Sequence, residues 1–298
     1  MEQRTAVLIS NPNAGRGGSH RAAEIAHFCE SLKSQHLPVE LMNTEEPGHA
    51  ARLAAQAAAA GATDVIVSGG DGTINEALQG LVGTKARLAI WPRGTANVLA
   101  LDLKLPFKSG LAAEAILSQR TRRVHVGCAT DEAKGVKRYF LLMAGVGVDA
   151  SVAGAVKPGL KRLIGKGAFY YAGMGFLLRW NLIPFTLEVG GQRFPATFAC
   201  LANAASYGGG LVLTPNARID EPEFEILLID TTSRAHYLYL LSKVMMARVR
   251  ADTPGVRYLH TKQARATGVA PVQVDGEVIG MTPMTFEIAP ETIEIIVS

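Results

Sequence analysis

The most informative stretch of this sequence is Val65-Ile66-Val67-Ser68-Gly69-Gly70-Asp71-Gly72-Thr73. Three β-branched residues in a row are typical of a buried strand, and the glycines directly after them predict a tight turn into a helix. In an open parallel sheet, ligands bind at the carboxyl ends of the strands. Glycine backbone N–H groups can approach an anion closely, and a helix N-terminus favours negative charge. The stretch therefore predicts a phosphate-binding loop between a buried strand and a helix.

The segments around this loop alternate between short apolar runs and helical patterns. In chain order they lie at residues 6–10, 19–35, 39–43, 48–60, 64–68, 73–81, 88–91 and 96–103. Strands that alternate with helices predict a parallel sheet with helices on both faces. We therefore expect a Rossmann-like nucleotide-binding α/β domain over residues 1–124.

The pattern changes near residue 124. From there on, Gly, Pro and Asn turns separate apolar runs at residues 139–144, 185–189, 196–202, 225–229, 272–274 and 292–297. Such runs predict the strands of an antiparallel sheet or sandwich. Two helical stretches interrupt them, near residues 160–178 and 235–250. We therefore expect a second, β-sandwich domain over residues 125–298.

Two more polar loops follow predicted strands of the first domain. One is Asn11-Pro12-Asn13-Ala14-Gly15, and the other is Pro92-Arg93-Gly94-Thr95-Ala96-Asn97. Arginine can neutralise phosphate charge, and threonine and asparagine can donate hydrogen bonds. Each loop in isolation fits an ordinary turn, but together with the glycine loop they predict a nucleotide site. Its candidate residues are Asn11, Asn13, Gly69, Gly70, Gly72, Thr73, Arg93, Gly94, Thr95 and Asn97.

Asp71 is a candidate metal ligand within this site. A carboxylate placed among phosphates requires a cation, and Mg²⁺ prefers oxygen ligands. The alternative is a glycine-rich turn that binds nothing.

The order of these motifs resembles the diacylglycerol kinase catalytic family, which includes bacterial lipid kinases, sphingosine kinases and ceramide kinases. Asn-Pro-x-x-Gly, Gly-Gly-Asp-Gly-Thr-x-Asn-Glu and Pro-x-Gly-Thr-x-Asn occur in this order. The resemblance continues through Gly145–Ala150, Tyr207–Gly210 and Asp275–Glu277, and so covers nearly the whole chain.

The resemblance implies a fold and an activity. The fold is an N-terminal nucleotide-binding domain and a C-terminal β-sandwich, with the active site in the cleft between them. The activity is that of an ATP- and Mg²⁺-dependent kinase acting on a lipid hydroxyl. The lipid is diacylglycerol or a related one, such as ceramide, a sphingoid base or phosphatidylglycerol.

Phosphoryl transfer also requires a carboxylate that accepts the proton of the attacking hydroxyl. By resemblance, Asp275 looks like this general base, and Glu277 looks like a carboxylate on the side of ATP or the metal. Some family members are instead interpreted with the aspartate that corresponds to Asp71 as the base. We favour Asp275, because a base from the second domain would face the γ-phosphate across the cleft. Asp275-Gly276 is also a common hairpin turn, and that alternative stays open.

The chain departs from the family pattern at a second metal loop. Family members often carry Leu-Asp-Asp-Gly, which in some of them holds a structural Mg²⁺, where this chain has Ile219-Asp220-Glu221-Pro222. Asp220 matches as a metal ligand. Glu221 is longer than aspartate and Pro222 lacks the backbone freedom of glycine, which puts this second site in doubt.

Two other functions compete with a lipid kinase. A soluble NAD kinase also uses Gly-Gly-Asp-Gly-Thr, but the Pro92–Asn97 loop and the Asp275–Glu277 element favour the lipid family. A catalytically silent lipid-binding protein would not need Asp71 together with Asp275 and Glu277.

Basic and apolar segments predict contact with an anionic membrane surface. Between Asp149 and Glu188 the chain carries five basic residues and no acidic ones, among large apolar residues. A second basic segment spans residues 234–250, where Tyr237, Leu241, Val244 and Met245 share a helical face. The alternative is two domain-covering helices with solvated basic flanks.

Composition limits the partners and the location. The chain has 298 residues and a formal charge of only +4, so we expect no nucleic-acid partner. Its three cysteines are widely separated, and no apolar stretch is long enough to span a bilayer. We expect a cytoplasmic protein that associates peripherally with the inner face of the membrane. No residue pattern decides whether it forms a homodimer.

Overall fold

The computed structural model describes residues 4–15, 20–148, 150, 183–207, 211–245 and 253–298. Contacts divide the chain into two compact units, Met1–Val124 with Glu291–Ser298, and His125–Pro290. The chain passes between the units within two strands, β5 (Thr121–Asp131) and β18 (Met284–Ile296). The last eight residues therefore group with the first unit, whereas the sequence analysis places them in the second domain. The helical stretch expected at residues 160–178 lies outside the described residues.

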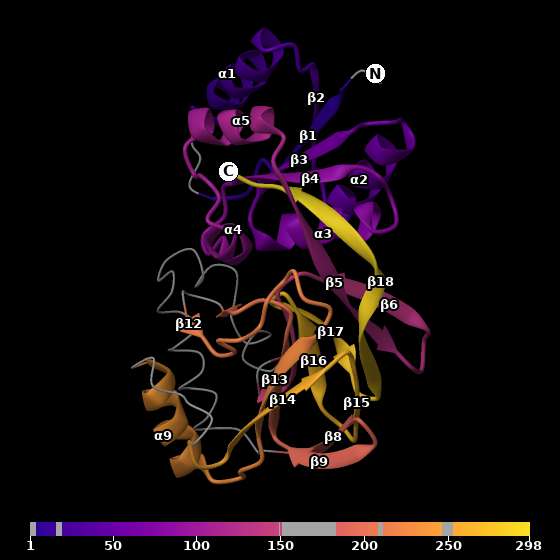
Figure 1. The fold of residues 1–298 in the computed structure, drawn as a ribbon, viewed down its shortest axis with the longest axis vertical. Helices are drawn as coiled ribbons and strands as arrows, with labels where there is room; N and C mark the ends of the chain where they lie inside the picture. The colour runs from indigo at the N-terminus through magenta and orange to yellow at the C-terminus, as the bar shows by residue number, and fades with distance from the viewer. Residues whose placement is uncertain (1–3, 16–19, 149, 151–182, 208–210, 246–252) are drawn as a thin grey trace. The chain divides into compact units, whose positions relative to one another are not determined.

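The first unit contains a parallel sheet in the strand order β2-β1-β3-β4 (Figure 1). Its strands are β1 (Ala6–Ser10), β2 (Val39–Asn43), β3 (Asp64–Gly69) and β4 (Arg87–Pro92). Its helices are α1 (Arg21–Ser34), α2 (His49–Ala59), α3 (Asp71–Leu81), α4 (Val98–Asp102) and α5 (Ser109–Ser118). The C-terminal part of β18 pairs with β4 in parallel, through Ile295 and Leu88.

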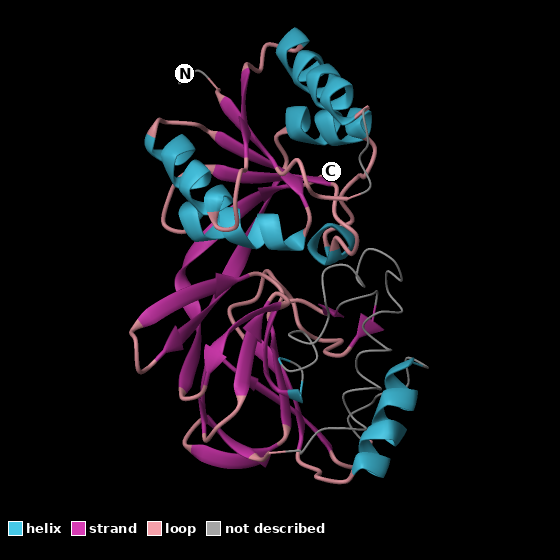
Figure 2. Ribbon diagram, turned by 180° about the vertical axis from the view of Figure 1, so that it is seen from behind, coloured by secondary structure: helices cyan, strands magenta, loops and turns pink. Residues whose placement is uncertain are grey.

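Helices cover both faces of this sheet (Figure 2). α1 packs beside α5, and α2 packs beside α3. On the α1 side, Leu8, Phe28 and Trp91 belong to one buried cluster, in which the rings of Phe28 and Trp91 stack at 4.2 Å. The chain leaves β1 toward β2 but leaves β3 toward β4, so the connections diverge between β1 and β3. Open α/β sheets bind ligands at the carboxyl ends of strands at such a point.

The amino ends of the same strands are held by a buried carboxylate. Asp64 is fully buried and accepts hydrogen bonds from Nε of Arg4 and Nε of Arg87, both at 2.6 Å. Arg4 also donates to the carbonyl of Ile116 at 2.7 Å. Two guanidinium groups compensate the buried charge of Asp64, and removing either one would leave that carboxylate with less compensation, which is unfavourable.

The structure confirms the expected α/β architecture of this unit and corrects the limits of its helices. The helix expected from Ser19 begins at Arg21, with His20 as its N-cap residue. The helix expected at residues 73–81 begins at Asp71, so the aspartate of the glycine loop lies in its first turn. Helix α5 was not expected, because its opening Ser109-Gly110 after Pro106 looks like a continued loop.

The second unit is a β-sandwich of antiparallel strands, as expected. One sheet has the order β14-β13-β10-β7-β16-β17, and the other joins β9, β8, β15 and the N-terminal part of β18, with β5 and β6 beside it. The strands of the first sheet are β7 (Met143–Gly147), β10 (Phe198–Ala202), β13 (Phe224–Ile229), β14 (Val256–Thr261), β16 (Pro271–Val274) and β17 (Glu277–Met281). Those of the second include β6 (Val136–Phe140), β8 (Phe185–Val189), β9 (Gln192–Ala196) and β15 (Gln263–Thr267). A short pair, β11 (Ser206–Tyr207) and β12 (Leu211–Val212), lies apart from both sheets, and the unit also contains α9 (Arg234–Met245).

Hydrophobic residues from both sheets meet in one core. Phe140, Phe185 and Phe286 come from one sheet, and Val146 and Phe224 come from the other. The rings of Phe140 and Phe224 stack at 5.7 Å across the two layers. Alternating apolar residues on facing strands therefore bury each other, which is how a sandwich closes.

The single strand predicted at residues 139–144 is wrong. The run expected as a single strand at residues 139–144 is two strands, because β6 ends at Phe140 and β7 begins at Met143. Leu141 and Leu142 between them form a buried bend. Local sequence cannot reveal this break, since an apolar run has no turn signal.

One residue of the predicted apolar face of α9, Tyr237, packs against its own unit. Tyr237 is 5% exposed, and its hydroxyl lies 2.6 Å from Oγ1 of Thr197. Burial raises the pKa of Tyr237. Tyr237 therefore anchors the helix inward, while Leu238 and Tyr239 are exposed. None of the helices in the described part of the chain has the length and apolar character needed to cross a membrane.

Glu132 ties a turn of the second unit to two neighbouring strands. Its carboxylate accepts hydrogen bonds from Nε of Arg265 at 2.7 Å, Nη2 of Arg265 at 2.8 Å and Oγ1 of Thr285 at 2.8 Å. The bonds from Arg265 and then from Thr285 lower the pKa of Glu132 to about 2.

Glu132 is expected to make unfolding sensitive to acid. Its folded pKa lies below the ordinary value of 4.5, so its stabilising contribution is complete above that pH and is lost as the pH falls toward 2. The contribution is small because solvent screens a surface ion pair. In urea unfolding between pH 2 and 5, Glu132→Gln should show a shallower pH dependence than the wild type, and Glu291→Gln serves as the control for loss of a glutamate charge. Identical slopes for Glu132→Gln and the wild type would contradict this expectation.

Candidate functional site

A side-chain hydrogen bond joins the loops after β1 and β3, where the connections of the sheet diverge. Ser10 and Ser68 are neighbours at the carboxyl ends of these strands, and Asn11 N–H donates to the carbonyl of Ser68 at 3.0 Å. Nδ2 of Asn11 donates to Oγ1 of Thr73 at 3.0 Å, in the first turn of α3. Oδ1 of Asn11 accepts the N–H of Asn13 at 2.9 Å. Asn11 thus shapes the first loop and holds it against the glycine loop.

The loop after β4 touches the glycine loop backbone to backbone. Arg93 N–H donates to the carbonyl of Gly69 at 2.8 Å. A Cβ atom added to Gly94 would lie 2.4 Å from Cα of Gly70, closer than real Cβ atoms come to other atoms. Because only glycine permits this approach, the two loops form one continuous backbone surface.

Gly94→Ala is expected to push these loops apart. Overpacking at a tight contact typically costs about 1–3 kcal/mol, which urea unfolding would detect. Gly72→Ala is the matched control in the same pair of loops, because a Cβ atom there would meet no atom within 4 Å. Equal unfolding midpoints for the two variants would show that the Gly70–Gly94 contact does not constrain the loops.

Asp71 is half-buried at the start of α3, with Gly70 as the N-cap residue. Its Oδ1 accepts the N–H of Leu99 at 3.3 Å, in the first turn of α4. The carboxylate therefore connects the glycine loop to the segment after Asn97. An oxygen ligand at this edge can share a hard cation with phosphate oxygens.

Two arginines bring positive charge to the same edge. Arg93 pairs with Glu24 at 2.5 Å, and Arg21 donates to the carbonyls of Pro12 and Ala14 in the first loop. Burial lowers the pKa of Arg21, the guanidinium of Arg93 lowers it further, and Glu24 opposes both effects. Like charges held this close favour the binding of an anion.

Asn97 and Thr95 differ in what they can offer a ligand. Oδ1 of Asn97 accepts the N–H of Gly94 at 2.8 Å, and Nδ2 donates to the carbonyl of Gly94 at 2.8 Å. Asn97 is buried, so its geometry gives it a role in shaping the loop. Thr95 is exposed and stays a candidate donor.

Sequence reasoning missed Thr44 and Arg21 at this edge. Thr44 directly follows β2, is buried, and donates its N–H to the carbonyl of Ser10 at 2.9 Å. A signal existed for Thr44, because it is a polar residue after an apolar run, like Asn11. No signal existed for Arg21, since only the folded chain brings α1 back to the first loop.

In the second unit, Asp275 and Gly276 form the tight turn between β16 and β17. Their φ angles are 47° and 86°, as a type I′ hairpin turn requires. Val274 pairs with Glu277 across the turn. The hairpin alternative therefore describes the backbone here, and two candidate carboxylates lie on this hairpin.

The carboxylate of Asp275 is engaged by the backbone of the Leu141–Met143 bend. Its Oδ2 accepts the N–H of Leu141 at 2.9 Å, and its Oδ1 accepts those of Leu142 at 2.9 Å and Met143 at 3.0 Å. Asp275 N–H also donates to the carbonyl of Met143 at 3.0 Å. A general base must offer a lone pair to the incoming hydroxyl. Three lone pairs of the Asp275 carboxylate already accept backbone N–H groups.

Glu277 presents its carboxylate differently. Its side chain is 54% exposed and accepts a hydrogen bond from Nη2 of Arg138 at 2.7 Å. A substrate hydroxyl can approach an exposed carboxylate directly. Sequence reasoning also missed Arg138, which lies on β6, far from Glu277 along the chain.

Asp220 lies in the loop before β13 and is exposed. Nε of Arg218 lies 3.6 Å from its carboxylate and 3.1 Å from that of Glu221. Within the described ranges, no group of three or more His, Cys, Asp or Glu side chains gathers as a metal-ligand set. Mg²⁺ is usually held by one or two carboxylates plus substrate phosphates. The lack of a metal-ligand set in the described ranges therefore argues against an all-protein Mg²⁺ site at Asp220, but not against Asp71 as a Mg²⁺ ligand.

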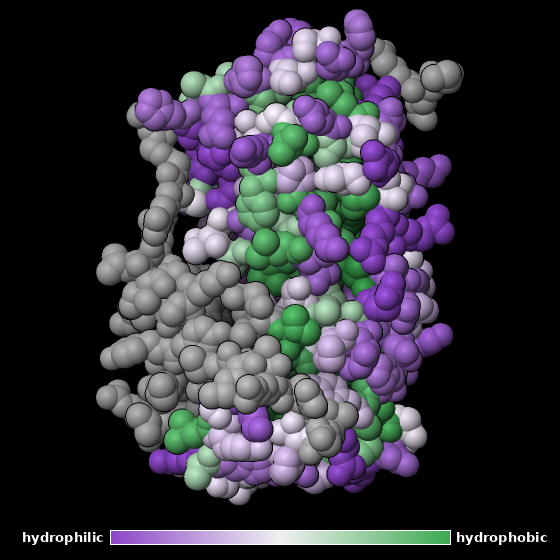
Figure 3. Space-filling view, turned by 60° about the vertical axis from the view of Figure 1, so that its left-hand side comes forward, coloured by the Kyte–Doolittle hydropathy of each residue, from purple (hydrophilic) through white to green (hydrophobic). Residues whose placement is uncertain are grey.

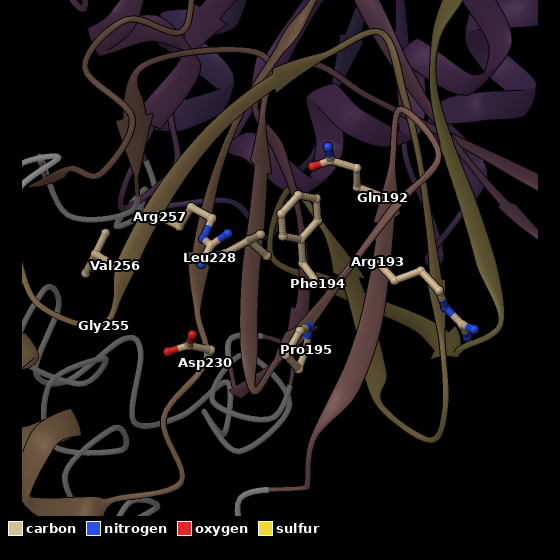
Figure 4. Close-up of a pocket in the computed structure, with 9 residues that line it drawn as sticks. All are labelled: Gln192, Arg193, Phe194, Pro195, Leu228, Asp230, Gly255, Val256 and Arg257. Carbon is tan, nitrogen blue, oxygen red and sulfur yellow. The ribbon is translucent and has the colours of Figure 1, made fainter.

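A hollow of about 510 Å³ in the second unit is a separate feature (Figure 4). The side chains of Phe194, Leu228 and Arg257 line it, from β9, β13 and β14. The strand register places Leu228 near one end of its sheet and Asp275 beyond the other end. None of the candidate residues lines this hollow.

Two family models match the chain. The diacylglycerol kinase catalytic domain matches residues 5–129, and the YegS C-terminal NAD kinase beta sandwich-like domain matches residues 143–297. The chain belongs to the diacylglycerol kinase-like lipid kinase family.

Two relatives and one solved structure show what the chain is similar to. The chain is 37% identical to a "Probable lipid kinase YegS-like" of Chromohalobacter salexigens, over 65% of this chain and 62% of that protein. It is 29% identical to a "Diacylglycerol kinase" of Mycobacterium tuberculosis, over 97% and 94% of the two chains. A crystal structure of a diacylglycerol kinase from Bacillus anthracis has the same fold, with a TM-score of 0.73, 21% identity and coverage of 100% and 98%.

Proposed function

We propose that this lipid kinase family member transfers the γ-phosphoryl group of ATP to the hydroxyl of a membrane lipid, with Mg²⁺ as its cofactor. The first domain, residues 1–124, would bind the nucleotide, and the second, residues 125–298, would bind the lipid. The observation that carries the proposal is the joined carboxyl edge of the first sheet, where Asn11, Asp71 and Gly94 connect three loops.

The residues at this edge fit a triphosphate. Gly70 and Gly94 approach so closely that an added side chain at Gly94 would intrude on the backbone of the glycine loop. Arg21 and Arg93 supply positive charge, and the start of α3 adds the favourable end of a helix. Catalysis of phosphoryl transfer rests mainly on such positioning and charge stabilisation.

The same edge fits Mg²⁺ through Asp71. When bound, the ion would neutralise charge on the phosphate oxygens. Asp71 would hold it, and the hydrogen bond from Leu99 N–H would keep this carboxylate in place. A structural Mg²⁺ at Asp220 has less support, because Arg218 already lies beside that carboxylate.

Within this proposal we assign proton acceptance to Glu277. Asp275 is the base that we predict from the sequence, but three backbone N–H groups engage its carboxylate, whereas Glu277 is exposed one residue beyond the turn. Asp275 would then fix the hairpin from which Glu277 projects. Asp71 stays a third candidate, and its role is separable by mutation.

We further propose that the acceptor is diacylglycerol or a related lipid with a primary hydroxyl, such as ceramide, a sphingoid base or phosphatidylglycerol. The Mycobacterium tuberculosis relative carries the name diacylglycerol kinase, which favours the first of these. Radiolabelled ATP should be tested against a panel of detergent-dispersed lipids and against soluble NAD. Mg²⁺-dependent label in one lipid supports the proposal. Label in NAD alone would make the protein an NAD kinase, and lipid binding without transfer would make it a silent binder.

We also propose peripheral contact with an anionic membrane, at the inner face of the cell membrane. In the first unit, Leu101, Phe107 and Leu111 are 45–51% exposed, and the exposed Lys104 and Lys108 lie between them in sequence. Hydrophobic surface lies among hydrophilic surface on the face drawn in Figure 3. Co-sedimentation should show salt-sensitive binding to phosphatidylglycerol vesicles. Equal binding to neutral phosphatidylcholine vesicles would refute the electrostatic part.

A further inference from the structure

Asn203 is a buried amide directly after β10 in the second unit. Asn203 is 0% exposed. Its Nδ2 donates to the carbonyl of His125 at 2.8 Å and to that of Leu141 at 2.9 Å. Two carbonyl partners fix the orientation of the amide, because only its NH₂ group can donate to both. Among the residues that the structure describes, none forms a hydrogen bond with its buried Oδ1. A buried amide oxygen without a partner is unfavourable. The two hydrogen bonds that Nδ2 donates are therefore the reason for an amide at this position.

Asn203 holds the same bend that Asp275 holds. Its backbone N–H donates to the carbonyl of Leu142 at 2.8 Å, and its side chain donates to that of Leu141. Asp275 accepts the N–H groups of Leu141, Leu142 and Met143 from the other side. The bend is thus clamped between an amide that binds its carbonyls and a carboxylate that binds its N–H groups.

The second hydrogen bond of the Asn203 amide leads to the Asp220 loop. Nδ2 of Asn203 donates to the carbonyl of His125, and the N–H of His125 donates to the carbonyl of Ile219 at 2.8 Å. Ile219 directly precedes Asp220. One side chain therefore links the hairpin of Asp275 and Glu277 to the loop of Asp220.

We propose that Asn203 is a positioning residue for the hairpin that carries Asp275 and Glu277. The inference rests on the proposed function, because hairpin position affects turnover only if this hairpin is catalytic. Without the amide, the bend loses the donor to the carbonyl of Leu141, the carbonyl of His125 loses its partner, and Asp275 loses the rigid partner that fixes the turn. Turnover should then fall while ATP binding stays, since the side chain of Asn203 donates to His125 and Leu141 of its own unit, whereas the candidate nucleotide residues belong to the first unit.

The test uses Asn203→Leu, which keeps the approximate volume but removes the amide. Its matched control is Thr197→Val, at the other end of the same strand, where a buried hydroxyl donates to the carbonyls of Ile229 and Thr231. Asn203→Leu should lower kcat by about 10- to 100-fold, as loss of a supporting hydrogen bond does, and leave KM for ATP unchanged. Hydrogen exchange of the Leu141–Met143 amides should accelerate in Asn203→Leu and not in Thr197→Val.

Asn203→Asp keeps the test decisive if Asn203→Leu does not fold. Its carboxylate would face two carbonyl oxygens at neutral pH, and protonation would restore one donor. Exchange protection at the bend should therefore recover on acidification, which a simple packing defect would not show. Unchanged exchange and unchanged kcat would overturn the proposal. A wild type without kinase activity would overturn the proposed function instead, while the exchange measurement would still test the clamp.

Discussion

Asp71→Asn is expected to lower kcat by roughly 100- to 1,000-fold while the protein stays folded, a range typical for loss of one preorganised electrostatic group. Asparagine retains an Oδ1 that can accept the N–H of Leu99, so the link from the glycine loop to α4 can persist. The substitution removes the negative charge and replaces one carboxylate oxygen by an NH₂ group. A cation held between Asp71 and the phosphates would lose its protein ligand, and turnover would fall for that reason.

The measurement is steady-state lipid phosphorylation at saturating ATP, repeated over a range of Mg²⁺ concentrations, with thermal unfolding in parallel. Glu114→Gln on the exposed face of α5 is the control, because it removes the same charge from the same unit away from the glycine loop. Its activity should match the wild type. Full turnover of Asp71→Asn with unchanged Mg²⁺ dependence would remove Asp71 from the site.

Glu277→Gln is expected to lower turnover by about 100- to 10,000-fold, the range for loss of a general base. Its stability should change little, since an exposed ion pair such as the one with Arg138 contributes roughly 0–1 kcal/mol. KM for ATP should stay close to the wild-type value. If Glu277 instead serves the nucleotide side, as the family resemblance implies, the apparent requirement for ATP or Mg²⁺ should rise.

Asp275→Asn provides the contrast on the same hairpin. An amide NH₂ would face at least one backbone N–H of the Leu141–Met143 bend, and an unsatisfied buried donor costs about 1–3 kcal/mol. We therefore expect a lower urea midpoint, with turnover per folded molecule reduced less than in Glu277→Gln. A stable but inactive Asp275→Asn, together with near wild-type turnover in Glu277→Gln, would return the base to Asp275. Glu223→Gln controls for charge loss at an exposed glutamate of the same unit.

Some features of the site could be predicted because they depend on neighbours in the sequence. The strand at Val65–Val67 follows from β-branched residues in a row, and the turn after it follows from glycine. The start of α3 comes at Asp71, inside the predicted glycine loop. Likewise, Asp275-Gly276 indicates its own hairpin, because aspartate and glycine both tolerate positive φ.

Other features depend on pairs of residues that only the folded chain brings together. In the sequence, Gly94 looks like a glycine of an ordinary turn. Only the folded chain brings it against Cα of Gly70, in the loop after a neighbouring strand. Arg21 looks like an ordinary helix residue until α1 packs back on the first loop. The carboxylate of Asp275 accepts hydrogen bonds from Leu141–Met143, more than 130 residues away in the sequence. These bonds lie at the bend that divides the apolar run, expected as one strand, into two strands.

Local sequence therefore predicts the order of strands and helices around the glycine loop, the change to antiparallel strands, and the residue types that fit phosphate and a metal. Those properties are local, because they arise from backbone preferences and from the period of apolar residues. Local sequence does not predict which carboxylate backbone donors engage and which one is exposed, because this depends on contacts made in the folded chain. Asp275 and Glu277 lie two positions apart on one hairpin, yet the backbone donors of a distant bend engage the first and leave the second at the surface.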